Sequence, residues 1–147
     1  MGTKAMTPPV GTTAQRPGGV DDEFNTGCMR FNTTIGSLEY YDGTAWVLPG
    51  KLTFSTVSSS TSVTASNVYF VNTGGGGVTL TLPASPNLGD EIRFYDVAKT
   101  FDSNALTVAR NGKLIQGDSA DLTVSTESAA FTLCFSGDSY GWRIFSI

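Results

Sequence analysis

The side chains best suited to chemistry in this chain are serine, carboxylate and cysteine, because the sequence contains no histidine. Without histidine, neither a Ser-His-Asp triad nor a Cys-His pair can form, and zinc loses a common ligand. Residues 117–119 and 137–139 both read Gly-Asp-Ser, which looks like the start of a hydrolase signature. A serine without a base is not activated, so we interpret both tripeptides as turns.

Carboxylates are the second group that could act. Residues 21–23 (Asp-Asp-Glu) form an acidic cluster, but consecutive carboxylates lack the alternate-position spacing of a calcium loop. A pair of carboxylates for glycoside cleavage comes together only in three dimensions, and Asp90, Glu91, Asp96 and Asp102 are the candidates for it. We expect a solvated turn at residues 21–23 and no catalytic pair in so small a domain.

The remaining motifs have simpler interpretations. The glycine run 74–77 is not followed by the Lys-Ser/Thr of a phosphate loop, so we interpret it as a connector. Residues 32–34 (Asn-Thr-Thr) match a glycosylation acceptor, but no signal-peptide pattern precedes them, so we interpret them as a turn. Cys28 and Cys134 have no CxxC partner and are expected to be small buried hydrophobes. The sequence therefore predicts no enzyme, no cofactor and no metal.

Composition narrows the choice of partners. The net charge is −4 and the pI is about 4.6, and the nine Lys and Arg residues are scattered, which argues against nucleic acid. No apolar run approaches the roughly 18 residues of a membrane span, so no membrane partner is expected. Charged residues make up only 15% of the chain. A surface rich in Ser, Thr and Asn can pack beside identical surfaces, which suits a component of an assembly.

Most of the chain, from residue 51 to residue 147, reads as one all-β body. About eight short strands recur at intervals of 8–12 residues, and no stretch over ten residues shows helical periodicity. This pattern predicts an antiparallel β-sandwich or jelly roll, with a second hairpin turning at Asn111-Gly112. The side chains expected to be buried are Phe54, Phe70, Leu80, Leu82, Ile92, Phe94, Leu133 and Phe135.

A smaller β module occupies residues 21–50. Residues 28–32, 38–42 and 44–47 read as a three-stranded meander, with Gly36 in the first loop and Asp42-Gly43 at the centre of the second turn. So small a sheet is marginal in water. It must therefore bury a face on the next domain or on another chain.

Residues 1–20 are predicted to be an extended N-terminal arm. The stretch has almost no large apolar residue, and Pro8, Pro9 and Pro17 enforce extended backbone. A disordered tail is one interpretation, and an arm that lies on a partner is the other. In the second, Arg16 is the charged anchor for a carboxylate of the partner, and the backbone adds to the partner's sheet edge.

Two segments carry a family resemblance. Residues 11–17, "GTTAQRP", followed by residues 29–47, "MRFNTTIGSLEYYDGTAWV", resemble a module of tailed-bacteriophage structural proteins. The C-terminal part, which includes "NGKLIQG" and "GWRIF", resembles β-domains of phage fibres and decorations more loosely. The resemblance implies a non-enzymatic virion protein, typically trimeric, that is made in the host cytoplasm and located on the particle surface.

The position on the particle stays open at this point. A compact body behind an arm favours a capsid decoration (cement) protein bound to other virion proteins, the major capsid protein above all. A short tail fibre or baseplate attachment protein is the alternative, and a host-glycan-binding module that uses exposed aromatic residues is the third. The residues expected to bind the partner, from the arm and the hairpin, are Thr7, Pro8, Pro9, Val10, Thr12, Thr13, Arg16, Pro17, Tyr40 and Trp46.

Overall fold

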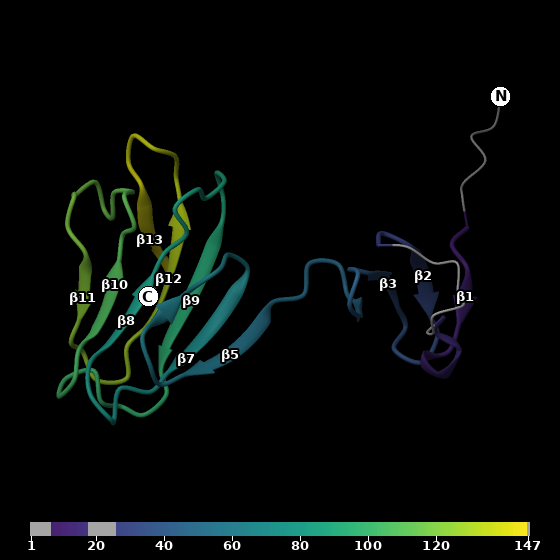
Figure 1. Ribbon diagram of the computed structural model, residues 1–147, viewed down its shortest axis with the longest axis horizontal. Coiled ribbons are helices and arrows are strands. Elements are labelled where there is room, and N and C mark those ends of the chain that lie inside the picture. Colours follow the sequence, from purple (N-terminus) through teal and green to yellow (C-terminus); the bar gives the residue numbers. More distant parts are fainter. Residues whose placement is uncertain (1–6, 18–25, 147) are drawn as a thin grey trace. The chain divides into compact units, whose positions relative to one another are not determined.

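The computed structural model describes residues 7–17 and 26–146, and it divides into two compact units (Figure 1). The N-terminal unit ends at Lys51 and the second unit, which we call the body, begins at Leu52. The break lies one residue after the boundary between residues 50 and 51 that the predicted ranges imply. The regular structure of the described residues is almost entirely β, which confirms the predicted all-β fold class.

The N-terminal unit contains one four-stranded sheet. Its strands are β1 (Val10–Gly11), β2 (Met29–Asn32), β3 (Ser37–Tyr41) and β4 (Trp46–Val47), in the order β1-β2-β3-β4. The pairs β2–β3 and β3–β4 are antiparallel, as the predicted meander requires. Strand β1 is an addition from the arm and runs parallel to β2. The arm's backbone thus joins a sheet edge of its own chain.

The turn between β2 and β3 lies where it was predicted, whereas the turn between β3 and β4 is shifted by one residue. Gly36 has a φ of 65°, as expected for the loop between β2 and β3. The second turn is centred one residue later than predicted, because the Asp42 N–H donates to the Ala45 carbonyl at 3.0 Å. The Asp42 carboxylate accepts the N–H groups of Thr44 and Ala45 at 2.8 and 2.7 Å. These bonds hold Gly43 and Thr44 at the tip.

The body packs two sheets face to face (Figure 1). One sheet has the order β13-β12-β9-β7-β5 and the other β11-β10-β8-β6. The strands are β5 (Thr53–Val57), β6 (Thr61–Ser62), β7 (Asn67–Val71), β8 (Val78–Thr81), β9 (Glu91–Asp96), β10 (Leu106–Ala109), β11 (Leu122–Val124), β12 (Ala130–Phe135) and β13 (Trp142–Ser146). The sandwich-like architecture agrees with the prediction.

The prediction that all strands of the body are antiparallel is wrong in part, because several neighbouring strands run parallel. From β5 to β10, successive strands alternate between the two sheets, so strands two apart in sequence become neighbours and run parallel. Antiparallel pairs follow at the C-terminal side, where β11 pairs with β10 and β12 pairs with β9 and β13. The sheets are therefore mixed.

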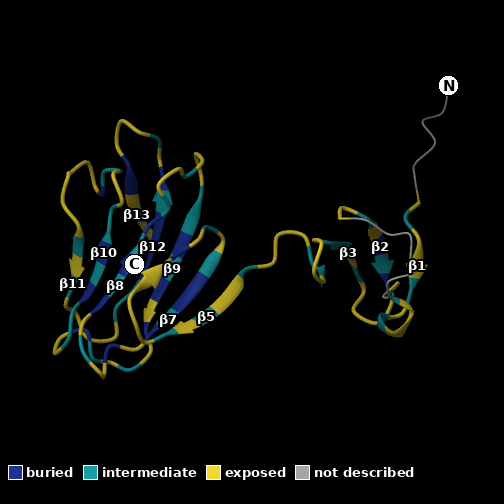
Figure 2. Ribbon diagram, in the orientation of Figure 1, coloured by how far each residue is buried: buried dark blue, intermediate teal, exposed yellow. Residues whose placement is uncertain are grey.

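The core lies between the two sheets, where the central strands are buried (Figure 2). Of the eight side chains expected to be buried, Leu80, Leu82, Ile92, Phe94, Leu133 and Phe135 are buried. Phe54 and Phe70 were assigned wrongly, since Phe54 is 59% exposed and Phe70 is half-buried. In β7 it is Tyr69 and Val71 that join the core, so Phe70 between them points outward.

The predicted second hairpin is also corrected. Asn111 and Gly112 have positive φ values of 49° and 87°, and the Lys113 N–H donates to the Arg110 carbonyl at 3.1 Å, so the turn itself exists. The chain after the turn does not return along β10, whose neighbours are β11 and β8. Ile115 instead forms a bridge to Trp142.

Candidate functional site

The two faces of the N-terminal sheet have opposite character. Because side chains alternate along a strand, Arg30 and Asn32 on β2 share one face with Glu39 on β3, and Arg30 and Glu39 are direct cross-strand partners. All three side chains are buried, although they are polar or charged. The interior of this unit is therefore a polar network.

Glu39 is the centre of that network. The Arg16 Nε donates to both carboxylate oxygens at 3.1 and 3.2 Å, and the Arg16 NH2 group donates to Oε2 at 2.5 Å. The Asn32 side-chain amide donates to Oε1 at 3.1 Å, and the Arg30 Nε lies 3.8 Å from the same oxygen. Hydrogen bonding from Arg16 lowers the pKa of Glu39 against the opposing effect of burial, and the same bond raises the pKa of Arg16.

The arm lies across this face as a strap, which we define as residues 12–17. A short 3₁₀ turn, η1 (Thr13–Gln15), begins the strap, and the Thr12 N–H donates to the Gln15 side-chain oxygen at 2.8 Å. Arg30 NH2 donates to the Thr12 carbonyl at 3.0 Å. Gly11 makes this approach possible, because a Cβ there would lie 2.5 Å from Arg30 NH2. The strap is thus held by its own chain.

These contacts correct the role assigned to Arg16. It was predicted to pair with a carboxylate on a partner, but it is committed to Glu39 of the same chain. Thr13 is likewise engaged, since its hydroxyl pairs with the Asn32 side chain and its N–H donates to Thr34 at 3.0 Å. Both residues build the unit.

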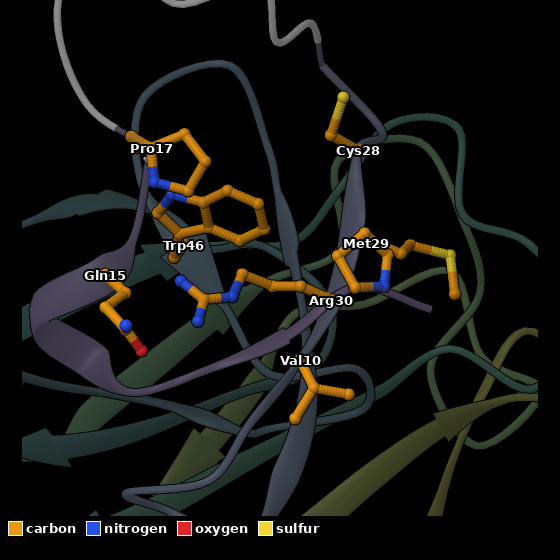
Figure 3. A pocket seen from close by; sticks show the side chains of 8 residues that line it. Val10, Gln15, Pro17, Cys28, Met29, Arg30 and Trp46 are labelled. Atoms are coloured by element: carbon orange, nitrogen blue, oxygen red, sulfur yellow. Dashed lines mark hydrogen bonds between the residues drawn. The ribbon is translucent and has the colours of Figure 1, made fainter. Parts of the chain in front are cut away.

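Trp46 and Pro17 complete the strap. The indole Nε1 of Trp46 donates to the Pro17 carbonyl at 3.2 Å, and the Arg30 guanidinium carbon lies 5.8 Å from the centre of the indole ring (Figure 3). The Tyr41 ring centre is also 5.8 Å from that of Trp46. A pocket of about 290 Å³ opens here, lined by Pro9, Val10, Gln15, Pro17, Cys28, Met29, Arg30 and Trp46.

The other side of the sheet, which we call the apolar face, has two cross-strand rows of hydrophobic side chains. One row is Val10, Phe31 and Leu38, and the other is Met29, Tyr40 and Val47. Val10 is 62% exposed, Met29 55% and Leu38 38%, and the other three are half-buried. A sheet normally turns its polar side to water, so this unit has its faces reversed.

The residues predicted to bind a partner are divided between these two faces. Val10 and Tyr40 lie on the apolar face, whereas Thr12, Thr13, Arg16, Pro17 and Trp46 belong to the strap side. Thr7, Pro8 and Pro9 precede β1, and the Pro9 carbonyl accepts the Phe31 N–H at 2.8 Å. Sequence reasoning missed the buried group Arg30, Asn32 and Glu39, although the alternation in "RFN" and "LEY" contains it.

The four candidate carboxylates each make local contacts: Asp90 accepts the Asn87 N–H at 2.9 Å, Asp102 accepts the Ser103 N–H at 2.8 Å, and Glu91 lies 3.5 Å from Arg93. Asp96 is buried, and its carboxylate accepts the backbone N–H groups of Thr100, Phe101 and Ser128 at 3.0–3.1 Å. These bonds hold the two loops that contain the donors against the end of β9. Asp138 pairs with the Lys113 ammonium at 2.7 Å. Within the described residues, no group of three His, Cys, Asp or Glu side chains could hold a metal ion. The acidic cluster 21–23 lies outside the described residues.

Two further expectations concern single side chains. Cys28 and Cys134 are both half-buried rather than fully buried. Trp142, one of the aromatic residues considered for sugar stacking, is completely buried, whereas Tyr140 is 65% exposed. Trp142 packs against Phe135 at a ring-centre distance of 5.4 Å and is therefore not available to a glycan.

Comparison with known proteins adds no assignment: no protein-family model matches the sequence, and no curated protein is significantly similar to it. Among the described residues, no helix is long and apolar enough to cross a membrane. Function must therefore be argued from the resemblance in the first 47 residues and from the geometry of the N-terminal unit.

Proposed function

We propose that this chain is a non-enzymatic structural protein of a tailed-bacteriophage virion, a capsid decoration protein attached to the shell through its N-terminal unit. The proposed partners are other virion proteins, with the major capsid protein favoured, and two further copies of the chain in a homotrimer. The proposed location is the particle surface, after synthesis in the host cytoplasm.

The observation that carries this proposal is the exposed apolar face. The exposed side chains of this face are those of Val10, Met29 and Leu38. The strap covers the opposite side of the same sheet through the Arg16–Glu39 pair. Each apolar side chain that passes from full exposure to full burial contributes roughly 1.5–3 kcal/mol. Exposed apolar patches of this kind mark interaction surfaces. The face therefore fits a protein partner with a complementary apolar surface.

The polar network supports attachment in a second way. A sheet of four short strands has little core, and its rigidity here comes from the Arg16–Glu39 pair and its bonds to Asn32 and Thr13. A rigid unit loses less conformational entropy on binding than a flexible arm does. In this account the strap fixes the shape of the unit, and the apolar face makes the contact.

A binding experiment on particles tests the proposal. Phage particles that lack the chain are incubated with the wild type, with Leu38→Lys or with Leu88→Lys, and bound protein is measured by co-sedimentation. Leu38 lies on the apolar face, whereas Leu88 is a 79% exposed residue of the body and provides the same chemical change as a control. We expect Leu38→Lys to weaken binding at least about 10-fold, or 1.4 kcal/mol. Equal binding by all three proteins would refute the proposed attachment surface.

The copy number separates the decoration protein from the tail alternative. A decoration protein saturates at a number set by the capsid lattice, whereas a short fibre or baseplate protein is present in low copy at a vertex or on the tail. A host-glycan-binding module would bind host cells as an isolated protein. Quantitative mass spectrometry of purified particles, together with a cell-binding assay, distinguishes these three outcomes.

A further inference from the structure

A second hydrophobic surface lies on the outer side of the body's five-stranded sheet. The inward positions of β7 and β9 are occupied by Tyr69 and Phe94, which belong to the core. Their neighbours Phe70 and Tyr95 are direct cross-strand partners and therefore point outward together. Phe54 on β5 pairs with Val68 and shares this outer side.

The three outward rings form a continuous ladder across β5, β7 and β9. Phe54 stacks on Phe70 with ring centres 6.1 Å apart and an interplanar angle of 20°. Phe70 contacts Tyr95 at 5.7 Å with an angle of 43°. Phe54 is 59% exposed and Tyr95 is 39% exposed, so the ladder is open to water. The cross-strand partner of Phe54 is Val68, and that of Phe70 is Thr56. We call the three aromatic residues together with Val68 and Thr56 the aromatic face.

The polar surroundings of the aromatic face do not call for a charged partner. Arg93 is on the same outer side, but its guanidinium already lies 3.5 Å from the Glu91 carboxylate of the same strand. The cross-strand partners of Tyr95 and Arg93 on β12 are Ala130 and Thr132, which carry no charge. The charges next to the three rings are therefore paired, whereas Arg143 on β13, two strands from Tyr95, adds an exposed positive charge at the far side of the sheet.

The outer side of the whole five-stranded sheet, of which the aromatic face covers three strands, has an area that approaches the lower limit for an interface between copies. Five strands at about 4.8 Å spacing and about 17 Å of strand length give a flat footprint on the order of 400 Å². Side chains that stand on the sheet make the accessible area larger than the footprint. Face-to-face packing thus approaches the lower end of stable interfaces, in which each partner buries roughly 600 Å².

We propose that the aromatic face is the surface through which the bodies of neighbouring copies of this chain associate. The occupant is a second copy, because the face is hydrophobic and its nearest charged side chain, Arg93, is paired with Glu91 of the same strand. A self-complementary contact joins two copies about a two-fold axis, so this inference concerns a contact between two bodies and depends neither on the proposed homotrimer nor on the chain being a virion protein.

Solution mass tests the inference directly. Sedimentation velocity is measured for the wild type, Phe54→Lys, Tyr95→Lys and the control Leu88→Lys over a range of concentrations. We expect the wild type and the control to associate, and both face variants to require at least about 10-fold higher concentration or to stay at the 15.5 kDa monomer mass. A face variant that associates like the wild type, or a wild type that is monomeric, overturns the inference. Near-UV circular dichroism confirms that each variant is folded.

A crosslinking experiment identifies the occupant even if a lysine variant fails to fold. The photoreactive residue p-benzoylphenylalanine replaces Phe54 in one protein and Leu88 in another, and the products are mapped by mass spectrometry. We expect position 54 to link two chains through the aromatic face, and position 88 to link them much less. A link within one chain, or no link at position 54, overturns the inference. The two proposals are tested independently: if Leu38→Lys no longer binds particles but still self-associates in sedimentation, the attachment surface and the contact between bodies are different surfaces.

Discussion

Replacing Glu39 by glutamine tests whether a buried ion pair holds the N-terminal unit together. The substitution keeps the shape of the side chain but removes the charge, and it places an amide donor where Arg16 and Asn32 also donate. Removing one partner of a buried pair typically costs 3–5 kcal/mol. The Arg16 side chain is 32% exposed and can regain water, whereas the Glu39 side chain is 0% exposed. We therefore expect a loss of about 2–4 kcal/mol.

A loss of this size is large for so small a unit. It corresponds to a roughly 30- to 700-fold increase in the population of the open unit. Hydrogen exchange with mass spectrometry measures it, since peptides from residues 26–51 should exchange faster in Glu39→Gln while peptides of the body do not change. Glu127→Gln is the matched control, because Glu127 is an exposed carboxylate of the body. Equal protection of the N-terminal unit in all three proteins would refute the reasoning.

The same network predicts a pH dependence. The pKa of Glu39 is lowered in the folded state, so its contribution to stability is complete above the ordinary value of about 4.3 and is lost as the pH falls below it. Asp42 also has a lowered pKa because backbone N–H groups bind it, and it acts in the same direction. NMR signals of the unit should therefore disappear in acid in the wild type and in Asp42→Asn, but Glu39→Gln should lose most of this dependence. A wild-type unit whose stability does not fall on acidification, or a Glu39→Gln unit with the same acid dependence as the wild type, would contradict the assignment.

Three further substitutions test other parts of the structure. Asp96→Ala leaves three backbone N–H groups without their acceptor and should lower the free energy of unfolding of the body by about 2–5 kcal/mol in urea denaturation. Gly141→Ala should prevent or strongly weaken folding, because φ is 71° and a Cβ would clash with the Leu114 backbone, which thermal denaturation would show. Trp46→Ala should cost about 2 kcal/mol in the N-terminal unit, less than full burial would imply, since the indole is half-buried; hydrogen exchange gives the value.

The positions of strands could be predicted from the sequence because each strand is a local pattern. "VTLTLP" alternates hydrophobic and polar residues, and Val78, Leu80 and Leu82 are buried as that alternation requires. Pairing is not a local property. The strands β5, β7 and β9 are parallel because the chain crosses to the other sheet between them, and no residue in those connections indicates this crossing.

The inward face of a strand was harder to predict than its position. In "KLTFSTV" and "NVYFVN", apolar residues occupy both faces, so the outward position of Phe54 and Phe70 depends on which residues the second sheet covers. In the N-terminal unit the apolar residues of "MRF" and "LEY" predicted a face to be buried on the next domain or on another chain, and the polar residues between them gave no prediction of an interior. The actual interior is polar because Arg16, 23 residues before Glu39, reaches across the sheet to neutralise it.

Imaging the particle by cryo-electron microscopy tests the central claim most directly, namely that this chain is a virion protein attached through the apolar face of its N-terminal unit. The account predicts density for the chain at every equivalent lattice position of the capsid, with Val10, Met29 and Leu38 against the shell and the strap away from it. The chain's absence from the particle would contradict the account, and so would attachment through the body with the apolar face left in water.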